Sequence, residues 1–123
     1  MKSYTDLEQS KKLAEILPLE SADMYWDYDV QKHEYYPMVM DEQFDDTCVR
    51  AWSLAALLEQ LPYELFDNDG NSSYLQIYKE DNVYQLVYTD PYRDFESIET
   101  DMCDYFVDAC YEMIIKLHER KLL

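Results

Sequence analysis

The chain has 123 residues, of which 48% are hydrophobic and 15% aromatic, and its formal net charge is −17. This length predicts a single domain over residues 1–123, and the aromatic content argues against disorder. The negative charge repels nucleic acid and anionic membranes and attracts basic proteins or cations. It therefore argues against direct binding of nucleic acid or membranes. A simpler explanation of the same net charge is that it only keeps a small protein soluble.

The N-terminal stretch YTDLEQSKKLAEILP, residues 4–18, predicts a short amphipathic helix. Thr5 stands three residues before Glu8, which is the spacing of a capping box, and Pro18 ends the pattern. The apolar side chains of this segment form one stripe, made of Leu7, Leu13, Ala14, Ile16 and Leu17.

Two strand-forming runs follow, MYWDYDV at 24–30 and EYYPMVM at 34–40, with a turn-like QKH between them. Pro37 predicts that the second run either lies at a sheet edge or is interrupted. Alternation along the first run separates one set of side chains, Tyr25, Asp27 and Asp29, from another, Met24, Trp26 and Tyr28.

The second half of the chain predicts another helix and another hairpin. AWSLAALLEQLP at 51–62 is a helix with Ser53 as its N-cap. LFDNDGNSS at 65–73 has the composition of a loop, residues 74–90 alternate as a hairpin with EDN as its turn, and PYRDFESIET at 91–100 is irregular.

The C-terminal stretch, residues 101–123, has the strongest helical pattern in the sequence. Its apolar face consists of Met102, Cys103, Phe106, Cys110, Met113, Ile114 and Leu117. The element order is therefore α-β-β-α-β-β-α. This order predicts an α+β domain with an antiparallel sheet of about four strands and three helices on one face.

The cysteines and the absence of a targeting pattern predict a cytoplasmic protein. Cys48, Cys103 and Cys110 form no CxxC pair and leave one thiol without a disulfide partner, as expected of free thiols in a reducing compartment. No stretch has the apolar length of a signal peptide or a transmembrane helix.

Catalytic and cofactor chemistry find little support in the sequence. The chain has two histidines, too few for a His-rich zinc site, and the calcium-loop register around Gly70 fails at its first and last positions. Cys48 stands next to Asp45 and Asp46, whose charges oppose thiolate formation, and no glycine-rich phosphate loop is present. We therefore predict that the chain is not an enzyme and holds no metal or cofactor.

Aromatic and acidic residues concentrate in the segment 21–48, which holds five Tyr or Trp and eight Asp or Glu. Such a surface suits a Lys- or Arg-rich partner through charge pairs and cation–π contacts. The partner would be a basic protein that this chain inhibits as an immunity protein does. Alternatively, it would be a nucleic-acid-binding protein that binds this chain because the carboxylates mimic phosphate charges. The predicted binding face consists of Tyr25, Asp27, Asp29, Tyr35, Asp41, Glu42, Asp45 and Asp46.

Three alternatives stay open. The tyrosines could be divided between the core and an amphipathic surface without any binding role. The chain could be a small-ligand or metal-binding accessory protein with a tyrosine-lined pocket. It could also be a structural homodimer that associates through Tyr105 and Ile115, which fall within the polar side of the last helix.

Three segments together resemble a family of small acidic proteins of gut Bacteroidetes and their mobile elements. They are YTDLEQSKKLAEILPLESADMY at 4–25, WSLAALLEQLP at 52–62 and VDACYEMIIKLHERKLL at 107–123. The resemblance implies a bacterial cytoplasmic setting and a compact α+β fold. It carries no activity, cofactor or catalytic residue to this chain.

Overall fold

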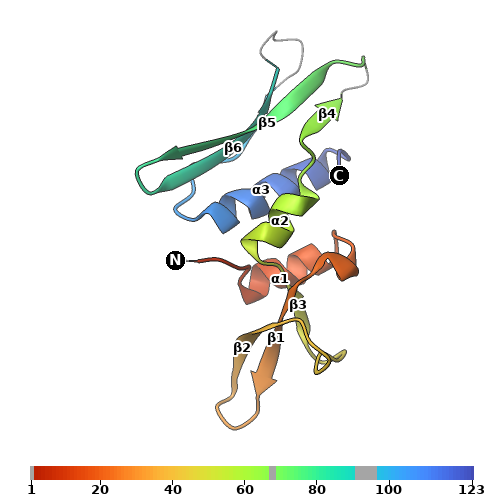
Figure 1. The fold of residues 1–123 in the computed structure, drawn as a ribbon, viewed down its shortest axis with the longest axis vertical. Helices are drawn as coiled ribbons and strands as arrows, with labels where there is room; N and C mark the ends of the chain where they lie inside the picture. Colours follow the sequence, from red (N-terminus) through yellow and green to blue (C-terminus); the bar gives the residue numbers. More distant parts are fainter. Residues whose placement is uncertain (1, 67–68, 91–96) are drawn as a thin grey trace. The chain divides into compact units, whose positions relative to one another are not determined.

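A computed structural model describes residues 2–66, 69–90 and 97–123 (Figure 1). The described residues form three α-helices and two antiparallel sheets, one of three strands and one of four, which confirms the predicted α+β class. The chain divides into two compact units, Ser3–Gln60 and Leu61–Leu123 together with Met1–Lys2. Each unit contains one of the sheets, and the single-domain organisation stays a prediction.

The first helix, α1, covers Leu7–Ala14 and is capped by Asp6, not by Thr5 as the sequence predicts. Asp6 Oδ1 accepts a hydrogen bond from the backbone N–H of Gln9 at 2.8 Å, and the Gln9 side chain accepts one from the Asp6 N–H at 3.1 Å. This reciprocal pair is a capping box one residue later than expected. The helix buries Leu13, and Leu17 beyond its end is also buried.

Thr5 does not cap the helix because its side chain bonds to a distant part of the chain. Its buried hydroxyl oxygen accepts a hydrogen bond from the Trp52 backbone N–H at 3.1 Å and lies 2.8 Å from Ser10 Oγ. Its own N–H donates to the Trp52 carbonyl at 2.9 Å, and the Trp26 indole donates to the Thr5 carbonyl at 3.1 Å. One residue therefore joins three segments of this unit.

The three-stranded sheet consists of β1 (Met24–Asp29), β2 (Glu34–Val39) and β3 (Val49–Ala51), in the order β2-β1-β3. A short 3₁₀ helix, η1 (Leu19–Ser21), leads into it. The first two strands are the predicted hairpin.

Pro37 lies on the edge strand, as its lack of an N–H requires. The Met40 N–H donates to the Asp23 carbonyl at 2.9 Å. Because backbone groups of alternate residues face the partner strand, this bond places the nitrogen of Pro37, three residues earlier, on the outer side of β2.

The second helix, α2, covers Leu54–Gln60. The predicted N-cap is confirmed, because Ser53 Oγ accepts a hydrogen bond from the Ala56 N–H at 3.2 Å. Ala51, the first residue of the stretch predicted as helical, instead ends β3 and pairs with Met24 of β1. Trp52 is fully buried at this junction and its indole donates to Ser21 Oγ at 2.9 Å.

The four-stranded sheet has the order β4-β5-β6-β7. The predicted hairpin is β5 (Ser72–Glu80) and β6 (Val83–Thr89). Two short strands arise in segments predicted to be irregular: β4 (Glu64–Phe66) pairs with β5, and β7 (Ile98–Glu99) pairs with β6. Within those segments, residues 67–68 and 91–96 lie outside the described residues.

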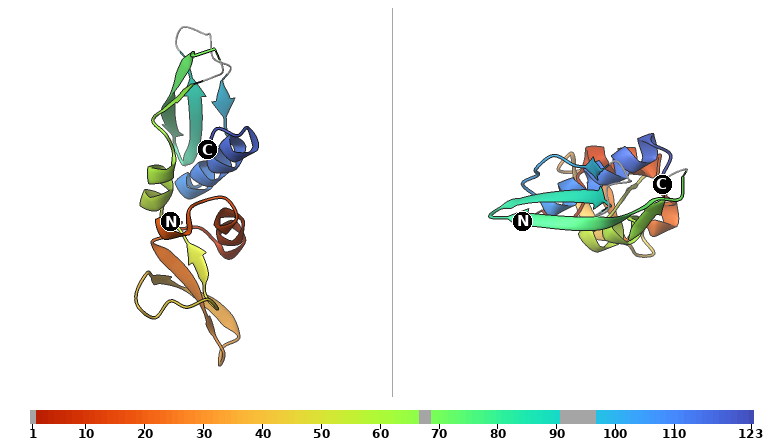
Figure 2. Two further views of the ribbon diagram at one scale, coloured as in Figure 1. Left: turned by 90° about the vertical axis from the view of Figure 1, so that its right-hand side faces the viewer. Right: turned by 90° about the horizontal axis from the view of Figure 1, so that it is seen from above.

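The last helix, α3, covers Phe106–Glu119 and lies against one face of the four-stranded sheet (Figure 2). The Phe106 ring stacks on Tyr84 of β6 with centroids 5.2 Å apart. The predicted apolar face is correct from Cys110 to Leu117, which are buried with Met113 and Ile114.

The start of the predicted helix is wrong. Met102 and Cys103 precede α3, and Cys103 forms a β-bridge with Tyr84. Met102 is 52% exposed, so it is not part of the core. The backbone at Cys103 pairs with β6 through two hydrogen bonds, and this pairing replaces the first helical turn.

We expect the Thr5 hydroxyl to stabilise the first unit. Thr5→Val keeps the shape of the side chain but leaves the buried Trp52 N–H without an acceptor, which costs about 1–3 kcal/mol. Urea unfolding monitored by tryptophan fluorescence measures this loss. Ser3→Ala, at an exposed position of the same segment, is the control and should change the free energy of unfolding by less than about 0.5 kcal/mol. Equal midpoints for Thr5→Val and the control would contradict the role given to the hydroxyl.

Candidate functional site

The register of β1 and β2 divides the predicted binding residues between two faces of the hairpin. Directly opposed residues share a face, and Asp27 pairs with Tyr36 while Asp29 pairs with Glu34. We call these four residues the acidic face. Tyr28 pairs with Tyr35 on the other side, with ring centroids 5.0 Å apart. Tyr35 therefore lies on the face opposite Asp27 and Asp29.

Tyr25 points to the same side as Asp27 but is fully buried. Its hydroxyl donates a hydrogen bond to Asp41 Oδ1 at 2.7 Å, and its ring meets the edge of Phe44 at a centroid distance of 5.5 Å. The bond to Asp41, together with burial, raises the pKa of the Tyr25 phenol above its ordinary value. Tyr25 is thus a core residue that fixes the loop after β2, and it offers no surface to a partner.

Asp27 lies at the centre of the acidic face. Its Oδ2 accepts a hydrogen bond from the Tyr36 hydroxyl at 3.0 Å, and its Oδ1 accepts one from the Tyr28 backbone N–H at 2.9 Å. The same oxygen lies 3.7 Å from Cys48 Sγ. The hydrogen bond to Asp27 raises the pKa of the Tyr36 phenol. Tyr36 is 38% exposed, so its ring and hydroxyl remain accessible beside the carboxylate.

Three of the predicted binding carboxylates organise turns. Asp29, Asp41 and Asp45 each accept a hydrogen bond from the backbone N–H two residues later, at 2.9, 3.0 and 2.8 Å. This is the geometry of an Asx turn, for which Asp is a preferred residue. Hydrogen bonds from Thr47 also lower the pKa of Asp45. These side chains shape the hairpin end and the loop before β3.

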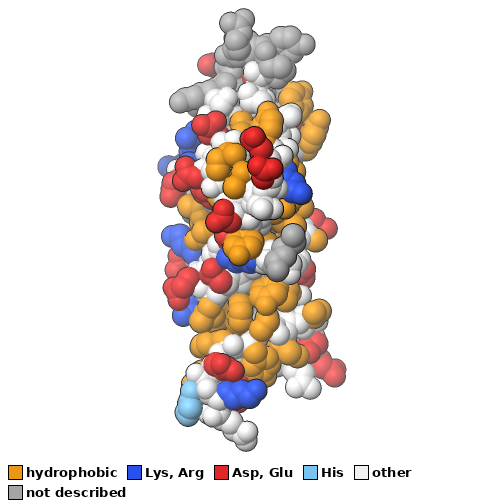
Figure 3. Space-filling view, turned by 90° about the vertical axis from the view of Figure 1, so that its left-hand side faces the viewer, with side chains coloured by type: hydrophobic (Ala, Val, Ile, Leu, Met, Phe, Trp, Pro, Cys, Tyr) orange, Lys and Arg blue, Asp and Glu red, His pale blue; other side chains and the backbone are white. Residues whose placement is uncertain are grey.

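The hairpin carboxylates have no compensating cations among the residues that the structure describes. The ion pairs among the described residues involve Lys2, side chains of α1 and α3, and Glu15 at the end of α1, and none involves an Asp or Glu between residues 24 and 50. Glu42 and Asp46 are exposed in the loop before β3. Figure 3 shows one side of the chain, where acidic side chains lie beside apolar and basic ones.

The three free thiols are unsuited to nucleophilic chemistry. Burial raises the pKa of Cys110 to about 12, and burial with the neighbouring Glu112 does the same for Cys103. Burial, followed by the charges of Asp27 and Asp45, raises the pKa of Cys48. Across residues 2–66, 69–90 and 97–123, no three His, Cys, Asp or Glu side chains come together as a metal site requires.

Two members of the acidic face, Glu34 and Tyr36, are absent from the sequence prediction. The signal that identifies them is the register of the hairpin. A turn of four residues between Asp29 and Glu34 pairs these two directly, and Tyr36 then stands opposite Asp27. The sequence pattern predicts the two strands but not their register, so it does not place Glu34 opposite Asp29 or Tyr36 opposite Asp27.

A pocket of about 380 Å³ lies in the same unit and has Phe44 as its aromatic lining residue. It contains no tyrosine and so differs from the tyrosine-lined pocket that the ligand alternative predicts. Of the residues named for a homodimer, Tyr105 is 44% exposed and Ile115 is half-buried.

Comparison of the chain with protein-family profiles, curated proteins and solved structures finds no significant match. Within the described residues, no helix has the length and apolar character needed to cross a membrane.

The raised phenol pKa values predict a loss of stability in alkali. An unfolded tyrosine loses its proton near pH 10, whereas Tyr25 and Tyr36 resist ionisation in the folded state. The folded state then binds more protons than the unfolded state, so the free energy of unfolding falls as the pH rises above about 10. Tyr25→Phe should reduce this slope in urea unfolding series between pH 8 and about 11. Tyr63→Phe, which alters an exposed ring, is the control, and an identical slope in both variants would contradict the assignment.

The surroundings of Cys48 predict slow alkylation. Asp27→Asn removes one of the charges that raise its thiol pKa. The variant should therefore react a few-fold faster with iodoacetamide at pH 8, because only the thiolate attacks. Mass spectrometry of the digested protein gives the rate at each cysteine, and Cys110, which is remote from the substitution in sequence and buried, is the internal reference. An unchanged ratio of the two rates would contradict the influence of Asp27.

Proposed function

We propose that this chain is a non-enzymatic binding protein whose acidic face holds a Lys- or Arg-rich segment of a basic partner protein. The observation that carries the proposal is the direct cross-strand pairing of Asp29 and Glu34, beside Asp27, with no ion pair to any of them in the described structure. Like charges directly opposed on a sheet are destabilising. A bound cation removes this repulsion, so the face favours a basic ligand.

Tyr36 adds a second mode of contact. An ammonium or guanidinium group can lie over its ring while bonding to the Asp27 carboxylate beside it. The hydrogen bond between these two side chains holds both in place before a partner arrives, which lowers the entropic cost of binding. The turn bonds of Asp29 fix its carboxylate in the same way.

An inhibitor of a basic protein is better supported than a nucleic-acid mimic. A mimic needs carboxylates in a regular row that matches the charge spacing of a duplex. The hairpin carboxylates instead gather at turns and on one short face. The free thiols support a reducing compartment, so we place this activity in the cytoplasm.

The test is binding of a fluorescein-labelled octalysine peptide, followed by anisotropy at low salt and again at about 0.3 M salt. The triple variant Asp27→Asn, Asp29→Asn, Glu34→Gln should weaken binding about tenfold or more. The control triple Glu99→Gln, Asp104→Asn, Glu119→Gln removes the same charge from exposed positions and should weaken it less than about threefold.

Equal losses in the two triple variants would mean that octalysine responds only to net charge, and the acidic face would carry no function. Unfolding midpoints verify that the first variant folds. Its amides preserve the acceptors of the turns while removing the repulsion between Asp29 and Glu34.

A further inference from the structure

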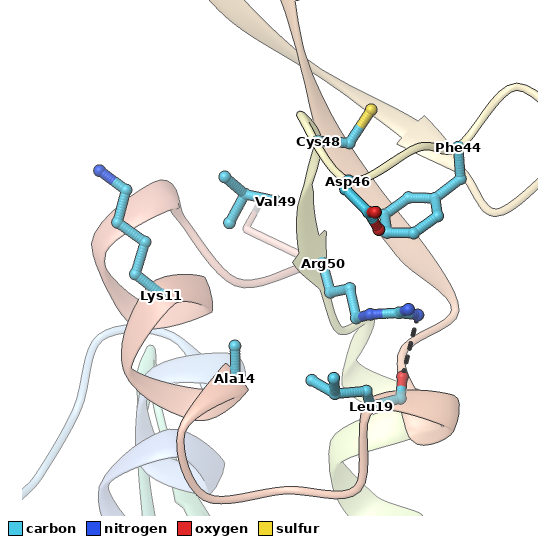
Figure 4. Close-up of a pocket in the computed structure, with 8 residues that line it drawn as sticks. All are labelled: Lys11, Ala14, Leu19, Phe44, Asp46, Cys48, Val49 and Arg50. Atoms are coloured by element: carbon cyan, nitrogen blue, oxygen red, sulfur yellow. Dashed lines mark hydrogen bonds between the residues drawn. The ribbon is translucent and has the colours of Figure 1, made fainter.

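The pocket in the first unit lies between α1 and the β3 segment (Figure 4). Its volume of about 380 Å³ falls within the range typical of small-molecule sites. Ala14, Leu19, Val49 and the Phe44 ring give it apolar walls, and its charged lining residues are Lys11, Arg50 and Asp46.

The lining is cationic although the surrounding chain is strongly acidic. Between residues 20 and 60 there are ten Asp and Glu against only two bases, Lys32 and Arg50. One of these two bases lines the pocket, and Lys11 reaches it from α1. The charge of the lining therefore differs in sign from that of the segment that builds most of it.

Arg50 is positioned in advance of any ligand. Its guanidinium lies over the Phe44 ring, 4.5 Å from the centroid, and Nη1 donates to the Leu19 carbonyl at 3.4 Å. It forms no ion pair with a carboxylate of the described chain. Guanidinium carries five N–H donors in a fixed fork, so several remain for an anion.

In Figure 4, Ala14 and Val49 lie between Lys11 and Arg50, and the Lys11 ammonium points away from Arg50. The Asp46 carboxylate lies on the Arg50 side, near the Phe44 ring. A ligand bonded to Arg50 can lay its apolar part against Ala14 and Val49, with Lys11 beyond them at the rim. This arrangement suits an anion with a short hydrocarbon body better than an inorganic ion.

We propose that this pocket binds a small organic anion, a carboxylate or phosphate on a short apolar body, with the anionic group bonded to Arg50. Charge-assisted bonds from a planar guanidinium are the strong and specific interactions for such groups. The Lys11 ammonium adds attraction without fixed geometry. The proposal does not depend on octalysine binding at the acidic face, because none of the four residues of that face lines the pocket.

Three probes of equal chain length test the charge preference: hexanoate, 1-hexanol and hexylammonium. Each is titrated into ¹⁵N-labelled protein over a millimolar range, with amide shifts followed by NMR. We expect hexanoate to give saturable shifts at Lys11, Ala14 and Val49. Hexanol should bind at least about fivefold more weakly there, because it lacks the charge that bonds to Arg50. Saturable shifts of equal affinity with hexanol, or with hexylammonium, would overturn the proposal.

Charge variants of the lining give opposite expectations. Arg50→Gln should weaken hexanoate binding about tenfold, and Asp46→Asn should strengthen it about threefold by removing a like charge. Lys11→Gln changes an exposed side chain, so it tests the proposal even if Arg50→Gln loosens the fold. The Lys11→Gln variant should bind hexanoate about threefold more weakly.

Arg120→Gln, exposed at the end of α3, is the control and should leave the affinity for hexanoate unchanged. Unchanged affinity in both Arg50→Gln and Lys11→Gln would overturn the assignment.

Discussion

The first unit depends on the hydrogen bonds that join Thr5 to Trp52. These residues are far apart in the chain, yet backbone and side-chain bonds tie them together, and the Leu54 N–H donates to the Ser3 carbonyl at 2.9 Å beside them. The junction holds the start of α1 against β3 and the start of α2. The pocket depends on this junction, because α1 carries its lining residues Lys11 and Ala14 while β3 carries Val49 and Arg50. The position of β1 also depends on it, because β1 pairs with β3. A fully buried hydroxyl thus helps to position two elements that line the pocket, although it does not line the pocket itself.

The negative charge of the hairpin has two separable roles. Asp29, Asp41 and Asp45 stabilise turns through bonds to backbone N–H groups, a role that needs an oxygen acceptor and not a full charge. Asparagine would meet the same need, so the choice of Asp adds charge beyond what the turns require. Repulsion between Asp29 and Glu34 lowers the stability of the hairpin, and the turns do not require it. Acidity that served solubility alone could be placed on any exposed position, whereas Asp29 and Glu34 stand directly opposite each other on neighbouring strands.

Local pattern was sufficient to predict the helices and the two hairpins, because each has its own period, cap or turn. It was insufficient wherever a distant partner decides the local structure. Thr5 has the spacing of an N-cap, but Trp52 takes its hydroxyl and Asp6 caps the helix instead. The strands β4 and β7 are two or three residues long and exist because β5 and β6 offer them backbone partners. In the candidate site, composition identified Asp27 and Asp29, whereas the burial of Tyr25 and the opposite orientation of Tyr35 depend on packing and register.

The outward nitrogen of Pro37 has a consequence for the behaviour of the protein at high concentration. An unpaired strand edge is a template on which another extended chain can add, and repeated addition leads to sheet growth. Pro37 removes one of the outward donors from the middle of β2 and interrupts the ladder that a second chain would need. The exposed hairpin, with its accessible tyrosines, can then meet other molecules through its side chains while its backbone edge is protected against self-assembly.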